Sequence, residues 1–158
     1  MSREQDNAPN RLVRTQASDP AFGALVIELD KDLAIRDGHE HAFFAQFNTL
    51  NDIKHVVLAW YGTPPVGCGA FKPFLDDALE IKRMFVPIGY RKQGIASLVL
   101  CDLEEWAREL GYRRCVLETG LKQPEAITLY QRNGYTLVPN YGQYAGVASS
   151  VCFEKLLP

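Results

Sequence analysis

The chain has 158 residues, and its 17 Lys and Arg against 19 Asp and Glu give a formal net charge of −2. This length is typical of one domain that folds without disulfides or metal, and a hydrophobic fraction of 47% excludes a disordered or fibrous protein. The near-neutral charge disfavours nucleic acid and anionic membranes as partners, and no segment approaches the ~20 apolar residues that a membrane span needs.

Residues 1–10 are polar and are expected to be disordered, which leaves residues 11–158 as a single domain. Because no apolar stretch follows a basic start, we expect no secretory signal and a cytoplasmic location. The cysteines are widely spaced in apolar segments, so we expect buried, reduced thiols rather than a zinc site, whose ligands usually pair closely in sequence. They are Cys68, Cys101, Cys115 and Cys152.

The first half of the chain begins with a short predicted strand over residues 12–15. A helix over residues 21–35 follows, because apolar residues recur there near helical spacing and Ser18 or Asp19 precedes it as an N-cap. Residues 42–50 predict a second, short helix. The β-prone runs 56–61 and 66–74 then predict a hairpin, and 78–86 a third strand; Gly62-Thr63-Pro64-Pro65 forms the hairpin turn.

The second half alternates between helix and strand. Residues 95–110 carry the clearest amphipathic pattern and predict a long helix. A strand over 114–118, a helix over 124–133 and a final strand over 150–155 follow. Antiparallel strands followed by a β-α-β-α-β stretch indicate an α/β or α+β sandwich around one central sheet.

A basic, glycine-containing turn, Arg91-Lys92-Gln93-Gly94-Ile95-Ala96, joins a strand to the long helix. The first N–H groups of a helix have no intrahelical partner and lie at the positive end of its dipole, so this turn predicts a site for a pyrophosphate. It lacks the glycine patterns of a P-loop or a dinucleotide fold. A solvated turn before a helix remains the alternative.

After the strand Met84-Phe85-Val86, the pattern Arg91-x-x-Gly94-x-Ala96 resembles the acyl-CoA signature of the GNAT acetyltransferase superfamily, Q/R-x-x-G-x-G/A. The resemblance extends from about Leu79 to Phe153. It departs from the pattern at Lys92, where many members have Gly, and at Ala96, where Gly is more frequent. The family's other motifs are matched by Leu117-Glu118-Thr119, Ala126-Ile127-x-Leu129-Tyr130 and Gly134-Tyr135. The resemblance implies an α/β (α+β) fold with a mixed central sheet, whose fourth and fifth strands splay apart, and flanking helices.

The resemblance also implies acetyl-CoA as the cosubstrate and no metal. Backbone groups of Phe85 and Val86 are expected to hold the pantetheine arm like an added strand, and Ala126 to flank the thioester. The pyrophosphate is expected to be held by Arg91, Lys92, Gln93, Gly94, Ile95, Ala96 and Ser97.

Transfer of an acetyl group to an amine needs a neutral amine, a polarised thioester carbonyl and a proton for the leaving thiolate. By resemblance, Tyr130 is the expected general acid, and the backbone N–H of Val86 is expected to meet the oxyanion. Glu80 is the first candidate for the base and Glu118, on the next strand, the second. A chain of water molecules without a protein base remains an alternative.

The acceptor pocket is expected to include Arg83, Glu118 and the loop that carries Tyr141 and Tyr144. Arg83 or Lys82 is a candidate to meet a carboxylate of the acceptor, because Arg binds carboxylates in bidentate fashion.

These features predict an acyltransferase: an acetyl-CoA-dependent N-acetyltransferase that acts on a primary amine by direct transfer in a ternary complex. A small molecule such as an amino acid or polyamine is favoured over a protein N-terminus or lysine. A non-catalytic acyl-CoA-binding sensor or interaction module is the main alternative, and an unrelated nucleotide-phosphate binder is a further one. A homodimer is an expectation by resemblance only.

Overall fold

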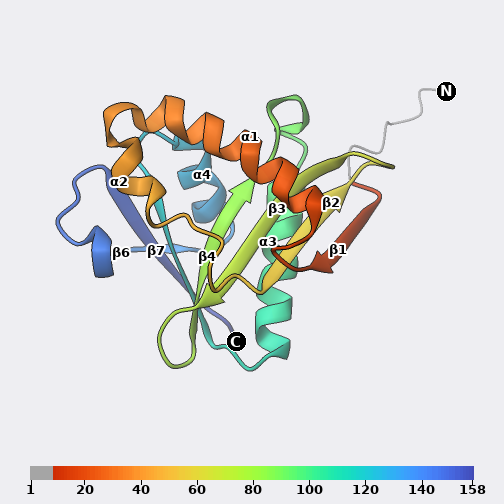
Figure 1. Cartoon of the computed structure of the whole chain (residues 1–158). Helices are drawn as coiled ribbons and strands as arrows, with labels where there is room; N and C mark the ends of the chain where they lie inside the picture. Colours follow the sequence, from red (N-terminus) through yellow and green to blue (C-terminus); the bar gives the residue numbers. More distant parts are fainter. Residues whose placement is uncertain (1–8) are drawn as a thin grey trace.

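The computed structural model describes residues 9–158 of the chain (Figure 1). The segment 1–10, expected to be disordered, lies outside the described residues except for Pro9 and Asn10. The Asn10 N–H donates to the carbonyl of Trp60 at 3.0 Å. The backbone bonds of the first strand therefore begin at Asn10, one residue before the predicted start of the domain.

The sheet has seven strands in the order β1-β2-β3-β4-β5-β7-β6. Neighbouring strands are antiparallel except β4 and β5, which are parallel. This confirms the mixed α/β sheet, although β6, with three residues, was not predicted. The strands are β1 Arg11–Thr15, β2 His55–Trp60, β3 Pro65–Pro73, β4 Ala78–Phe85, β5 Arg114–Gly120, β6 Thr136–Val138 and β7 Ser150–Leu156.

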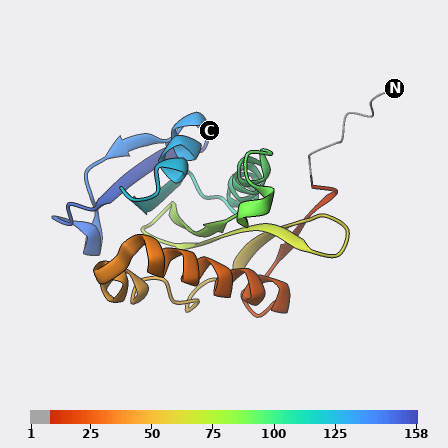
Figure 2. The same cartoon turned by 90° about the horizontal axis from the view of Figure 1, so that it is seen from above.

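Helices cover both faces of the sheet (Figure 2). α1 and α2 lie on one face, and α3 and α4 lie on the other. None of the helices in the described part of the chain combines the length and hydrophobicity needed to cross a membrane. The helices are α1 Pro20–Asp37, α2 His41–Ala45, α3 Ile95–Glu109 and α4 Pro124–Arg132, with single 3₁₀ turns η1 Gly38–Glu40, η2 Ile88–Tyr90 and η3 Gly142–Tyr144.

Helix α1 begins as the sequence predicts. The side chain of Asp19 accepts a hydrogen bond from the Ala21 N–H at 2.9 Å, which makes Asp19 the N-cap. The predicted helix over 42–50 is wrong beyond Ala45. The N–H groups of Phe47 and Asn48 bond three residues back instead of four, and the polar residues that follow favour turns over helix.

The core on the α3 face depends on two glycines of β3. A Cβ on Gly67 would lie 2.7 Å from the Ile95 side chain, and a Cβ on Gly69 would lie 2.8 Å from Leu103 Cδ1 and 2.9 Å from Val99 Cγ1. Helix α3 therefore packs directly on the backbone of β3. Cys101, expected to be buried, is exposed because it lies on the side of α3 that faces away from the sheet.

Strand β4 contains a β-bulge opposite Gly69. Ala70 pairs with Lys82 and Cys68 with Phe85, so the single residue Gly69 faces two residues of β4. Arg83, one of those two, has a left-handed φ of 59°. The extra residue interrupts the strand's alternation of side chains, so Lys82 and Arg83 both point toward the α1 face.

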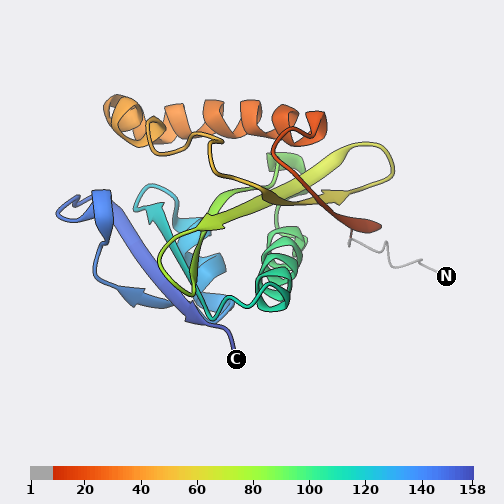
Figure 3. The ribbon, with the colours of Figure 1, turned by 60° about the horizontal axis from the view of Figure 1, so that its bottom comes forward.

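The predicted splay of the central strands is present, and it begins just before the bulge. β4 and β5 pair only from Ala78–Arg114 to Glu80–Val116. Figures 1 and 3 show the two strands meeting at one end and diverging toward the other. The carboxyl-terminal half of β4 therefore leaves backbone groups free on the side that faced β5.

We predict that Gly69→Ala lowers the free energy of unfolding by about 1–3 kcal/mol, because the new Cβ overpacks the contact with α3 and Met84. Urea denaturation followed by circular dichroism measures the change. Gly23→Ala is the matched control: no atom lies within 4 Å of its Cβ, and within α1 it is expected to add up to about 1 kcal/mol. Equal stability of Gly69→Ala and wild type would contradict the close packing of α3 on β3.

Candidate active site

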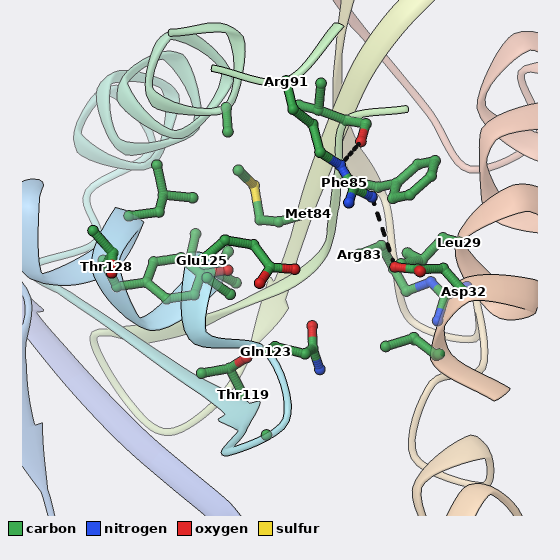
Figure 4. A pocket seen from close by; sticks show the side chains of 18 of the residues that line it. Leu29, Asp32, Arg83, Met84, Phe85, Arg91, Thr119, Gln123, Glu125 and Thr128 are labelled. Carbon is green, nitrogen blue, oxygen red and sulfur yellow. Dashed lines mark hydrogen bonds and ion pairs between the residues drawn. The ribbon is translucent and has the colours of Figure 1, made fainter. Parts of the chain in front are cut away.

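A cavity of about 550 Å³ occupies the space between the diverging strands β4 and β5. Figure 4 shows α1 on one side of it and α3 with α4 on the other. It extends from the turn before α3 to Tyr144 of η3. The residues that the sequence assigns to the donor turn, the general acid and part of the acceptor pocket therefore share one cavity.

At one end, the cavity meets the start of α3. Gly94 is the N-cap, with a left-handed φ of 78°, and within the described chain no side chain caps the helix. The N–H groups of the first turn are thus left for a ligand or water. Six residues of the predicted phosphate turn line the cavity: Arg91, Lys92, Gly94, Ile95, Ala96 and Ser97.

Gln93 differs from its neighbours. It does not line the cavity, and its Oε1 accepts a hydrogen bond from the Tyr61 hydroxyl at 3.2 Å. Lys92, at the position where many GNAT members have Gly, has a left-handed φ of 64°. This conformation costs a non-glycine residue about 1–2 kcal/mol, which accounts for glycine in that place.

The Arg91 guanidinium is fixed against the wall of the cavity. Its Nε donates to the carbonyl of Val86 at 2.8 Å, and its Nη2 lies 3.7 Å from a carboxylate oxygen of Asp32 on α1 (Figure 4). It also lies over the Phe85 ring, 5.8 Å from the centroid. Arg91 therefore joins the end of β4 to α1 and brings a positive charge to the end of the cavity beside the start of α3.

Tyr130 reaches the middle of the cavity from α4. The side chain is buried, and its ring packs against Tyr135 and Phe153 with centroid distances of 5.6 and 6.2 Å. Among the described residues no partner bonds its hydroxyl. Burial, together with the nearby charge of Glu118, raises the pKa of Tyr130, so the phenol keeps its proton at neutral pH. Ala126, one helical turn earlier, lines the cavity beside it.

Glu118 lines the same cavity from β5. Its carboxylate accepts a hydrogen bond from the Ser150 hydroxyl at 2.9 Å. Burial raises the pKa of Glu118 to about 7, against the opposing effects of Ser150 and the Lys82 charge, while Glu80 and Asp37 raise it further. This carboxyl therefore keeps its proton up to a much higher pH than an exposed glutamate does.

Glu80 lies at a different place. It belongs to the last β4–β5 pair before the strands diverge, and it is not among the residues that line the cavity. Its carboxylate accepts from the Tyr141 hydroxyl at 2.6 Å and lies 3.8 Å from Lys72 Nζ. Of the predicted acceptor residues, Arg83, Glu118 and Tyr144 line the cavity, whereas Tyr141 pairs with Glu80 outside it.

The sequence interpretation missed Asp37 of α1. Its buried side chain lines the cavity, and burial raises its pKa. An Asp beside a helix-ending Gly is typical of a solvated helix end, so no sequence signal points to it. Ser97 and Asn133 are also connected: the Asn133 amide donates to Ser97 Oγ at 3.1 Å, which links α3 to α4 at the edge of the cavity.

The family model for the acetyltransferase (GNAT) family matches residues 16–135 of the chain. The chain is 32% identical over 149 residues to the IAA acetyltransferase of Azospirillum brasilense, which covers 92% of this chain and 97% of the relative. Among solved structures, a Klebsiella pneumoniae protein described as an acyl-CoA N-acyltransferase is 27% identical and has a TM-score of 0.77, with 94% of this chain and 97% of that one covered. A GNAT family acetyltransferase from Elizabethkingia anophelis with acetyl-CoA bound is 21% identical with a TM-score of 0.67, with 93% and 97% covered.

Proposed function

Because this chain belongs to the GNAT acetyltransferase family, we propose that it transfers the acetyl group of acetyl-CoA directly to a primary amine of a small molecule such as an amino acid or polyamine. The observation that carries the proposal is the single cavity that holds the uncapped start of α3, the Tyr130 hydroxyl and the Glu118 carboxylate. The bound acetyl-CoA in the Elizabethkingia structure supports the choice of donor.

The donor is proposed to enter between β4 and β5. Its pyrophosphate accepts hydrogen bonds from the first N–H groups of α3, with Arg91 and Lys92 contributing positive charge and the Ser97 hydroxyl a further donor. Its pantetheine amides pair with the backbone of Phe85 and Val86, because β4 has lost its partner strand there. The thioester then lies near Ala126 and Tyr130.

The chemistry is proposed to proceed in a ternary complex. Glu118, in its ionised form, takes a proton from the acceptor's ammonium, and the neutral amine attacks the thioester carbonyl. The Val86 N–H stabilises the oxyanion of the tetrahedral intermediate. As the C–S bond breaks, Tyr130 donates its proton to the CoA sulfur, which leaves as a thiol, and the nitrogen passes its surplus proton to the Tyr130 phenolate, which gives the neutral amide.

Glu118 is preferred to Glu80 as the base because it faces the cavity and its pKa of about 7 suits proton transfer at neutral pH. Glu80 is engaged with Tyr141 and Lys72 outside the cavity. A small acceptor is favoured because residues of α1 and α2, among them Asp37 and Phe44, line the same cavity as Glu118.

Tyr130→Phe tests the catalytic role. We expect kcat to fall at least ~100-fold, because the thiolate loses its proton donor, while the Kd for acetyl-CoA measured by calorimetry stays within about twofold since the ring packing is kept. Tyr112→Phe, which alters a tyrosine packed on Phe71 away from the cavity, is the control and is expected to keep full turnover. An unchanged kcat in Tyr130→Phe would contradict the general-acid role, and absence of turnover in wild type would favour a binding module.

The pH profile of kcat/KM identifies the base. Glu118 is protonated below about pH 7 and ionised above it, so we expect kcat/KM to rise with pH through about 7 and to change slope there. In Glu118→Gln we expect the inflection near pH 7 to disappear and kcat/KM to fall at least ~100-fold. Glu80→Gln should keep the inflection. If Glu80→Gln loses the inflection and Glu118→Gln keeps it, Glu80 is the base.

A further inference from the structure

We propose that the acceptor is an amino acid, whose carboxylate pairs with the Lys82 ammonium while its amine faces Glu118; this inference rests on the proposed function. Lys82 is only 8% exposed and lines the cavity. In the described part of the chain its Nζ makes no hydrogen bond and no close ion pair. Unlike Arg83 Nε and Nη1, the Lys82 Nζ is not fully enclosed, so a carboxylate in the cavity can reach it and act as its partner.

The carboxylates whose charges act on Lys82 are already bonded to other groups. Glu80 accepts from Tyr141 and lies beside Lys72, and Glu118 accepts from Ser150. Both attract the Lys82 charge without a direct ion pair, whereas Lys72 and Arg83 repel it, and burial lowers the pKa of Lys82. The cavity therefore contains a cation whose own neighbours leave it able to bind an anion.

The buried Arg83 guanidinium adds a second positive charge beside Lys82. The bulge turns it toward the same face as Lys82, where its Nη2 donates to Asp30 of α1 at 2.6 Å. Its Nε and Nη1 are buried and have no partner among the described residues. Because the side chain is only 1% exposed, Arg83 acts on the cavity through its charge, and Lys82 is the group within reach of the acceptor.

Charges of the opposite sign line the same cavity. Asp37 and Glu118 suit the ammonium of an acceptor, whereas Lys82 suits a carboxylate. An amino acid carries both groups and matches both signs. A polyamine would place a second ammonium near Lys82 and Arg83 and would be repelled, and the N-terminus of a protein has no free carboxylate beside its amine.

The test compares acceptors that differ only in the carboxylate. CoA release is measured with acetyl-CoA and each of the standard amino acids, β-alanine and 4-aminobutyrate, then with the amide and the decarboxylated amine of every active acid, and with spermidine. We expect kcat/KM for the best free acid to exceed that of its amide and amine at least tenfold. Equal or better turnover of the amide, the amine or spermidine would overturn the inference.

Failure of the inference can be told from failure of the proposed function. If no acid is acetylated but calorimetry shows that acetyl-CoA binds, the amino-acid assignment is wrong while the donor site stands. If acetyl-CoA itself does not bind, the proposed function falls and this inference falls with it.

Lys82→Met removes the charge and keeps the apolar stem. We expect it to lower kcat/KM at least about tenfold more for the free acid than for its amide, chiefly through KM, and to leave acetyl-CoA affinity unchanged. Loss of the Lys82 charge also raises the pKa of Glu118, which slows both acceptors alike and does not change this ratio. Lys72→Met is the matched control, because Lys72 also lies beside Glu80 but does not line the cavity; it should keep the preference for the acid. If kcat/KM of Lys82→Met falls by the same factor for the amide and for the acid, Lys82 does not bind the carboxylate. Should the variant not fold, the comparison of acid, amide and amine on wild type decides.

Discussion

Where β3 has the single residue Gly69, β4 has Arg83 and Met84, and the extra residue determines what faces the cavity. It turns Lys82 and Arg83 to one face of the sheet, and it lies within the stretch after Glu80 in which β4 runs without β5 beside it. Two hydrogen bonds fix Arg83, whose φ is left-handed: its side chain donates to Asp30 of α1, and its carbonyl accepts from the Cys68 thiol at 3.3 Å. Gly69, without a Cβ, leaves room for Met84 on the opposite face.

Burial then sets the protonation of the groups that the strands present. The same low-dielectric surroundings raise the pKa of Tyr130, which stays a proton donor, and bring the pKa of Glu118 to about 7, where it exchanges a proton readily. The two groups are coupled, since the Glu118 charge is one of the reasons that Tyr130 holds its proton. The Lys82 charge opposes the effect of burial: it lowers the pKa of Glu118 and so favours the ionised carboxylate.

The sequence predicts well what depends on neighbouring residues. The N-cap of α1 at Ser18 or Asp19, the start of α3 after Gly94 and the position of Tyr130 on a helix all follow from local spacing, and the structure selects Asp19 as the cap. The relation of Glu80 and Glu118 to the cavity could not be predicted in this way, because it depends on the pair at which β4 and β5 separate. Asp37 was missed for a similar reason, since only the packing of α1 over the sheet brings it to the cavity.

Thermal unfolding of the purified protein with and without saturating acetyl-CoA tests the central claim most directly, namely that the space between β4 and β5 is the donor site. A ligand at about 100 times its Kd adds roughly 2.7 kcal/mol. For a domain of this size the midpoint is then expected to rise by about 5–10 °C, at about 2–4 °C per kcal/mol. No shift at millimolar acetyl-CoA would mean that the turn from Arg91 to Ala96 only begins a helix, and would contradict the account.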